Sequence, residues 1–130
     1  MKTEITPDEK LFSFSEADKL LPLVRSITQK HQTELTPIQN RLKKMLSNDP
    51  RRNSVEHEYE QVVSRWKSKV EKLGTSVCGL WVVEFNVGEG ALSWRYPELS
   101  LAYFRATGVE FSNRVKIDDY IEEFDPDWAV

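Results

Sequence analysis

The sequence is poor in cysteine and in long hydrophobic runs. Its 130 residues include one cysteine, Cys78, so no disulfide can form within the chain. The opening residues Met1-Lys2-Thr3-Glu4 lack the apolar stretch of a secretory signal. No apolar stretch approaches the roughly 20 residues that span a bilayer. We therefore expect a protein of the reducing cytoplasm that does not cross a membrane.

Charge is spread unevenly along the chain, although the net charge is only -3. Residues 41–72 carry nine Lys or Arg against five Asp or Glu, whereas residues 118–130 carry six acids and no base. A basic helical region can attract a phosphate backbone, but an acidic protein with so acidic an end is a poor candidate for non-specific nucleic-acid binding. We therefore do not expect nucleic acid as the main partner of this protein. RNA binding stays open as an alternative, through a basic cluster made of Arg41, Lys43, Lys44, Arg51 and Arg52.

A helical hairpin is predicted over residues 13–73, after a loose polar arm at residues 1–10. Ser13 and Glu16 have the spacing of a capping box, which marks the start of a helix. Apolar residues then recur in steps of three and four, which is helical spacing close to a heptad. Pro22 and Pro37 each remove a helical donor, so we expect the helix to kink or restart near both.

The turn-rich segment 47–53 separates two apolar stripes and is predicted as the tip of the hairpin. A second helix then runs from Ser54 to Leu73, and Gly74 follows as its stop signal. Because the connection is short, we expect the two helices to lie antiparallel with their apolar stripes facing each other.

After Gly74 the apolar residues alternate with polar ones, which is the spacing of strands. We expect three or four antiparallel strands within residues 75–117, at 81–87, 92–96, 99–103 and 109–117, with Gly88-Glu89-Gly90 as a hairpin turn. The acidic tail at 118–130 carries Tyr120, Ile121, Phe124 and Trp128 at helical spacing, which favours a short amphipathic helix or turn. The sequence therefore predicts a single α+β domain over residues 1–130.

Four charged residues of the predicted sheet form the candidate ligand site. Three of them lie on the face of the sheet opposite the aromatic stripe of Trp81, Phe85 and Trp94, and Glu98 lies at the end of a strand beside them. Two arginines near carboxylates can hold an anion or orient a proton acceptor. The simpler interpretation is a set of cross-strand salt bridges on a solvated face. The four residues are Glu84, Arg95, Glu98 and Arg114.

The sequence predicts neither a metal site nor a cofactor. His31 and His57 lie on different helices, and neither has a second His or Cys three or four residues away. Cys78 has no basic neighbour in sequence, and a buried strand thiol is usually inert. The glycines around Glu89 join two strands, whereas a phosphate-binding loop leads from a strand into a helix.

Five motifs occur in order along the chain. Residues 12–22 read F-S-F-S-E-A-D-K-L-L-P, residues 79–85 G-L-W-V-V-E-F, residues 93–98 S-W-R-Y-P-E, residues 103–105 Y-F-R and residues 111–114 F-S-N-R. Their order resembles an uncharacterised prokaryotic family of hypothetical proteins, the domain of unknown function twenty-two oh three, with its F-T-x-E-E-A-N-x-L-L-P, G-L-V-D-F and C-W-R-x-G-E motifs. The resemblance implies a helical hairpin with a sheet, and it brings no assigned activity.

This chain departs from the family pattern at three positions. The family's Cys, His and Glu are replaced near those places by Ser93, Arg105 and Ala106. Any metal or catalytic cluster that used the family residues would be lost here, because these replacements cannot form a soft metal site. The residues that do match the family pattern are Glu84, Arg95, Glu98 and Arg114.

The sequence does not identify an enzyme, and its function stays open among three hypotheses. The leading one is a small non-enzymatic domain that binds a protein partner or forms a homodimer, since heptad-like stripes suit association. The second is a small-molecule or anion-binding protein, or an enzyme, that uses the four sheet residues. The third is RNA binding through the basic cluster at the hairpin tip.

Overall fold

The computed structural model describes residues 10–119, which form two long helices followed by an antiparallel sheet. Helix α1 (Phe14–Lys44) and helix α2 (Arg52–Glu71) make the hairpin. The strands pair in sequence order, so the sheet is a meander and the predicted α+β class is confirmed. The strands are β1 (Ser76–Gly79), β2 (Val82–Asn86), β3 (Gly90–Arg95), β4 (Tyr103–Ala106) and β5 (Val115–Lys116), with a 3-10 helix η1 (Phe111–Asn113) before the last.

Helix α1 begins with the predicted capping box. The Ser13 backbone N–H donates to Glu16 Oε1 at 2.9 Å, and the Glu16 N–H donates to Ser13 Oγ at 3.1 Å. The prediction of a restart at the prolines is wrong, because one helix runs through both Pro22 and Pro37. Both prolines lie on the exposed side of α1, where water can hydrogen-bond the carbonyls that lose a partner.

A buried polar layer joins the two helices midway along the hairpin. Trp66 Nε1 donates to Thr28 Oγ1 at 2.9 Å, and Thr28 Oγ1 donates to the Val24 carbonyl at 2.8 Å. One turn further, His31 Nδ1 lies 2.8 Å from the Ile27 carbonyl, which fixes this nitrogen as the donor. His31 Nε2 is then the acceptor, and the Lys69 ammonium lies 3.3 Å from it. These contacts favour one alignment of α1 against α2.

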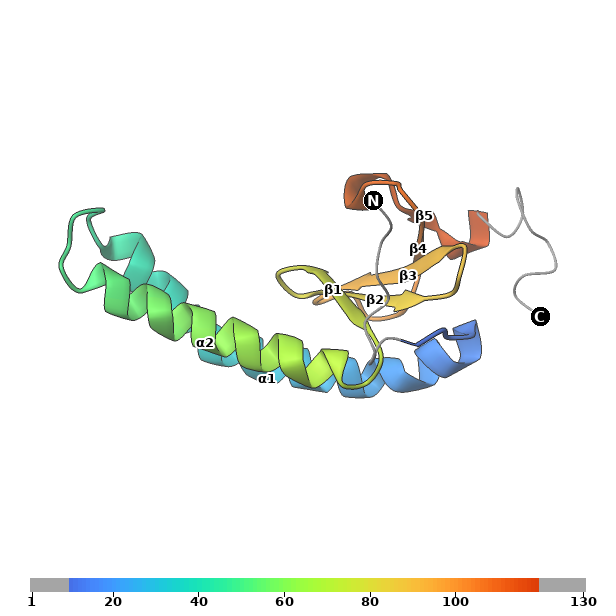
Figure 1. Ribbon diagram of the computed structural model, residues 1–130, viewed down its shortest axis with the longest axis horizontal. Coiled ribbons are helices and arrows are strands. Elements are labelled where there is room, and N and C mark those ends of the chain that lie inside the picture. Colours follow the sequence, from blue (N-terminus) through green and yellow to red (C-terminus); the bar gives the residue numbers. More distant parts are fainter. Residues whose placement is uncertain (1–9, 120–130) are drawn as a thin grey trace.

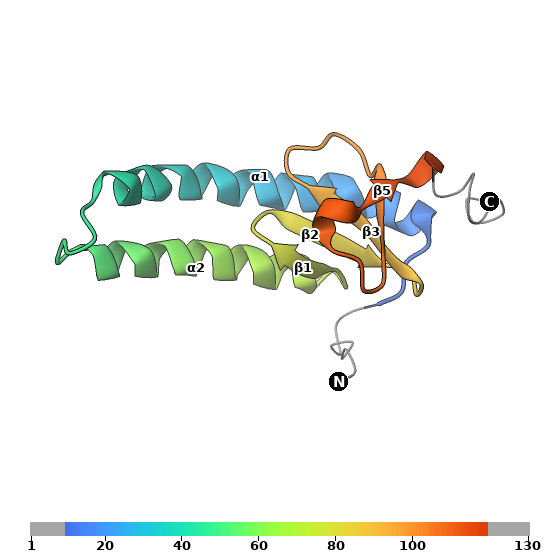
Figure 2. The same cartoon turned by 90° about the horizontal axis from the view of Figure 1, so that it is seen from above.

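The apolar core has two parts. The larger part joins the start of α1 and the end of α2 to the sheet, and its largest buried side chains are Trp66, Trp94, Phe85 and Phe104. The smaller part lies between the helices further out and contains Leu35, Ile38, Val55 and Val62. Figures 1 and 2 show that the sheet covers the base of the hairpin and that the other half extends beyond it. We call residues 32–62, which form this uncovered half, the outer arm.

The sheet has five strands where three or four were predicted, because β1 was not among the predicted strands, and its C-terminal part differs as well. The predicted strand 99–103 is wrong, because β4 begins at Tyr103 and residues 97–102 form a connection. The predicted strand 109–117 is reduced to η1 and the two residues of β5. Leu101 enters the core from a loop and Ile117 from the first residue of a helical turn. Alternation alone cannot distinguish such residues from those of a strand.

The predicted C-terminal helix lies mostly outside the described residues. Its first turn is present, since residues 117–119 are helical and Ile117 is buried. Within residues 10–119, neither α1 nor α2 combines the length and the apolar character that crossing a membrane requires.

Candidate functional site

The sheet has an apolar inner face and a polar outer face. The inner face carries Val83, Phe85, Leu92, Trp94 and Phe104 against the hairpin. The pairing register aligns Glu84, Ser93, Tyr103 and Lys116 across the outer face, and places Arg95 beside Val82. Figure 1 shows η1 on this outer side, away from the helices. The predicted site therefore lies between the sheet and the segment that contains η1.

Glu84 is held by an arginine that is not among the four predicted residues. Arg105 Nε and Nη2 donate to the two Glu84 carboxylate oxygens at 2.8 and 2.6 Å. The third contact of Arg105 is made by Nη1, which donates to the Val109 carbonyl at 2.6 Å. The Glu84 side chain is 3% exposed, so both charges are largely removed from water. Each charge therefore compensates the desolvation cost of the other. The same hydrogen bonds raise the pKa of the Arg105 guanidinium above its usual value.

Glu98 and Arg114 form a second, separate ion pair. Arg114 Nη1 donates to Glu98 Oε1 at 3.1 Å and its Nη2 contacts Oε2. The Arg114 guanidinium lies 4.1 Å from the Tyr103 ring centroid and 4.3 Å from that of Phe111, so it stacks against both rings. This pair therefore fixes η1 to the outer face.

The structure brings three of the four predicted residues together. The Arg95 backbone N–H donates to Glu98 Oε1 at 2.9 Å, and the exposed Arg95 guanidinium lies 5.6 Å from the Phe111 ring, beside Arg114. Glu84 belongs instead to the pair with Arg105. Within residues 10–119, the Arg95 guanidinium contacts no carboxylate, so it is free to bind an anion through paired donors.

Ser93 lies between the two ion pairs and was not among the predicted site residues. It is opposite Glu84 on β2, and its carbonyl accepts from Arg114 Nη1 at 3.3 Å. The side chain is fully buried, and its Oγ has no hydrogen-bond partner among residues 10–119. A buried hydroxyl in this position usually bonds to an ordered water. The sequence carried no signal for this, because it depends on the register of three strands.

The basic cluster at the hairpin tip is largely compensated by neighbouring carboxylates. Arg41 pairs with Glu58 at 2.6 Å, Arg51 with Asp49 at 2.8 Å, and Arg52 with Glu56 at 3.0 Å. Hydrogen bonds from Arg51 lower the pKa of Asp49 to about 2, so this pair stays ionised. The two remaining members, Lys43 and Lys44, are exposed at the end of α1.

The two histidines and the cysteine lie in different surroundings. His31 is buried in the seam of the hairpin, and His57 is exposed on α2. Cys78 lies on β1 and is exposed, so the expectation of a buried thiol is wrong. Partial burial still raises the pKa of its thiol, and the Glu84 carboxylate raises it further. Within residues 10–119, no group of three His, Cys, Asp or Glu side chains has an arrangement that could hold a metal ion.

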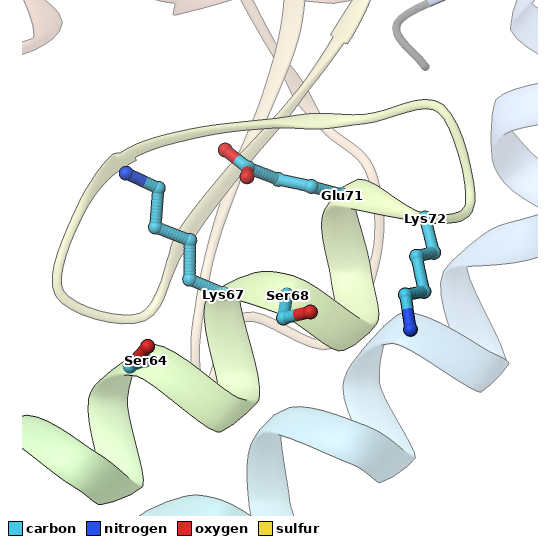
Figure 3. Close-up of a pocket in the computed structure, with 5 residues that line it drawn as sticks. All are labelled: Ser64, Lys67, Ser68, Glu71 and Lys72. Carbon is cyan, nitrogen blue, oxygen red and sulfur yellow. The ribbon is translucent and has the colours of Figure 1, made fainter.

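A shallow hollow of about 250 Å³ lies on the exposed face of α2. Figure 3 shows that its five lining side chains come from consecutive turns at the end of this one helix: Ser64, Lys67, Ser68, Glu71 and Lys72. With walls from a single helix, the hollow cannot enclose a ligand as a binding cleft does. We therefore assign no site to it.

A second depression, of about 370 Å³, lies between α2 on one side and β1 with Leu80, which follows it, on the other. We call it the apolar notch. Tyr59, Val63 and Trp66 form its wall on α2, and Val77 and Leu80 stand opposite them. Lys67, Cys78 and Gly79 complete the lining. Leu80 is 37% exposed at the rim, and the Trp81 ring packs edge-on against Trp66 beneath, with centroids 4.8 Å apart. The walls come from two elements, and most of the lining is hydrophobic.

Comparison with known proteins identifies the family and no activity. Searches among curated proteins and among solved structures find no match to this chain. The family model described as "Uncharacterized conserved protein (DUF2203)" matches residues 10–117, which include both helices and all five strands. The resemblance seen in the motifs is thereby confirmed, and the chain belongs to the DUF2203 family of uncharacterised conserved proteins.

Proposed function

We propose that the chain is a protein-interaction domain whose docking surface is the apolar notch. The observation that carries the proposal is the composition of this notch. Tyr59, Val63 and Leu80 offer aromatic and aliphatic surface in a concave site above the buried Trp66, and Lys67 supplies a charge near it. Interfaces are anchored by large apolar side chains that fill such depressions. A hydrophobic side chain of a partner would be removed from water there.

The outer arm offers a partner further surface next to the apolar notch. It begins beside the notch and extends past the sheet, so a partner seated at Leu80 could also lie along α2. The sheet needs the hairpin only at its base, where the larger part of the core lies. Leu46 is a large exposed apolar residue at the far end of the arm. We infer that the arm enlarges the interface rather than supports the sheet.

Fewer of the four predicted residues now support the ligand-binding alternative. Glu84 and Glu98 are each engaged by an arginine, so neither carboxylate is placed to accept a proton from a substrate without breaking an ion pair. Arg95 stays a candidate for binding an anion. The RNA alternative is weakened because three of the five tip bases are already paired. For RNA binding we expect salt-sensitive gel shifts, which vanish when Arg51 and Arg52 are both replaced by Glu.

Site-specific photocrosslinking in cells that express the chain tests the proposal. A benzophenone amino acid is placed at Leu80, at the rim of the notch, and in a matched control at Leu99, which is also an exposed leucine. We expect one discrete adduct from position 80 and none from position 99. An adduct of twice the mass of the chain identifies a second copy as the partner. Equal labelling from both positions, or no adduct from position 80, contradicts the proposal.

Purified variants supply the second measurement. Leu80→Asp places a charge at the rim of the notch, and Leu99→Asp makes the same change away from it. With the crosslinked protein as the probe, we expect Leu80→Asp to weaken binding about tenfold or more and Leu99→Asp to leave it unchanged. Unaltered thermal unfolding of both variants shows that the loss concerns binding and not folding.

A further inference from the structure

Two large apolar residues form the turn between β1 and β2. Gly79 pairs with Val82 across the hairpin, so the connection consists of Leu80 and Trp81 alone. Two-residue turns usually take Gly, Asn or Asp, and the Trp81 φ of 62° lies in the left-handed region that favours those residues. Trp81 is explained by its packing against Trp66. Leu80 is 37% exposed at the rim of the apolar notch, so the fold of one copy does not explain an aliphatic residue there.

The surface around Leu80 is complementary to itself. It carries a depression, whose α2 wall includes Tyr59 and Val63, and beside it a projecting apolar side chain. Such a surface can bind a second copy of itself about a two-fold axis, because each copy then fills the depression of the other. Every contact of the interface is made twice, which makes a small surface count double.

The charges beside the notch match such an axis. Glu60 and Lys67 are exposed on α2, and within residues 10–119 neither forms an ion pair. They lie on the same side of the helix but about 10 Å apart along it, which is too far for them to pair with each other. If two α2 helices cross antiparallel with the axis between Val63 and Ser64, Glu60 of each copy meets Lys67 of the partner subunit. This axis also passes through the notch, since Val63 lies near the middle of its α2 wall.

One pair of like charges also faces each other under this symmetry. Glu71 falls opposite Glu56 of the partner subunit, at positions about 11 Å along the helix from the axis. Helices that pack at an angle have separated at that distance from their crossing point. The Glu56 carboxylate is also 3.0 Å from Arg52 Nε, which compensates its charge. The electrostatic match of the two copies therefore depends mainly on Glu60 and Lys67.

We propose that the chain forms a two-fold homodimer in which Leu80 of each copy enters the apolar notch of the other, and Glu60 pairs with Lys67 across the axis. This inference rests on the proposed function and names its partner as a second copy of the chain. The docking surface is incomplete in one copy, because the side chain that fills the notch comes from the other.

Sedimentation equilibrium of the full chain and of charge-reversed variants tests the dimer. We expect the mass of two chains at about 100 μM protein and dissociation on dilution. Glu60→Lys and Lys67→Glu each place like charges across the axis, so each should raise the dissociation constant about tenfold or more. The double variant restores opposite charges and should return the constant to within about threefold of the unaltered chain. Lys43→Glu, an equal change at the exposed far end of α1, is the matched control and should have no effect.

Two results would overturn the dimer. The first is a monomer mass at about 100 μM protein. The second is a double variant that associates no better than the single variants, or single variants that associate as well as the unaltered chain, since Glu60 and Lys67 would then not meet. Thermal unfolding of each variant shows whether it is folded.

The photocrosslink from position 80 separates this inference from the proposed function. A monomeric chain that still gives one discrete adduct with a different protein contradicts the homodimer and keeps the notch as a docking surface. A monomeric chain without any adduct from position 80 contradicts both.

Discussion

Arg105 binds the buried Glu84 carboxylate through two guanidinium nitrogens, and this contact holds the chain after β4 against the outer face. Removing one member of such a pair leaves a charge that has neither water nor a partner. We expect Arg105→Met to lower the free energy of unfolding by about 3 kcal/mol or more, measured by urea denaturation. The double variant Glu84→Leu with Arg105→Met should regain most of that loss. Equal stability of the single and double variants would show that the pair is not what Arg105 contributes.

Thr28 provides the acceptor for the indole N–H of Trp66, which is fully buried between the helices. Thr28→Val keeps the shape of the side chain but leaves this donor without a partner, so we expect a loss of about 1–3 kcal/mol in the free energy of unfolding. Thr33→Val makes the same change at an exposed position of α1 and should cost much less. Two equal losses would assign the effect to helix propensity instead of the hydrogen bond.

Cys78 is the single thiol of the chain, so its alkylation can be followed without interference. Burial and the Glu84 carboxylate raise its pKa, and the reactive species is the thiolate. At neutral pH we therefore expect iodoacetamide to react more slowly with the folded protein than with the protein in urea. The rate for the folded protein should still be rising at a pH where the rate in urea has levelled off. A faster reaction of the folded protein would contradict this assignment.

The β2–β3 hairpin depends on Gly90, because the next strand passes directly over its α-carbon. A Cβ at Gly90 would lie 2.4 Å from the Arg105 carbonyl oxygen and 2.7 Å from the Phe104 ring. We expect Gly90→Ala to destabilise the fold strongly, by about 3 kcal/mol or more. Gly79→Ala is the matched control, since its Cβ would have an ordinary 3.8 Å contact with Val82. Thermal unfolding of both variants measures the difference.

The elements follow from sequence to different degrees. The hairpin is predictable because its capping box and its three-and-four spacing are local signals, and β2 and β3 are predictable from alternation around the glycine turn. Residues 99–102 were wrongly predicted as a strand because Leu101 reaches the core from a loop, which gives the same alternation as a strand. The restart expected at Pro22 and Pro37 does not occur, because the cost of a lost hydrogen bond depends on exposure to water, which the sequence does not state.

The candidate site was only partly predictable for a similar reason. Alternation assigns Glu84, Ser93 and Arg95 to one face correctly, and the register confirms it. Alternation cannot say that Arg105, 21 residues later, supplies the partner of Glu84, because that contact depends on how β4 aligns with β3. The apolar notch was not predicted either, since its walls are brought together by the packing of β1 against α2.

At the scale of the whole molecule, the hairpin is longer than the sheet that it supports. The base of the hairpin shares its core with the sheet, whereas the outer arm has a smaller core between the two helices, with Trp81 packed against its near end. Fewer buried contacts mean a smaller free energy for local opening. An interaction domain tolerates this, because a partner that binds the arm supplies the missing layer and stabilises it by mass action.

Native-state hydrogen exchange along the hairpin tests this division most directly. In the isolated protein, we expect amides of the outer arm, at 35–42 and 55–62, to exchange by local opening at a lower free energy than amides of β2 and β3. Addition of the crosslinking partner should slow exchange in the arm and around Leu80 while leaving β3 unchanged. Protection of the arm equal to that of β2 and β3 in the isolated protein would contradict the account.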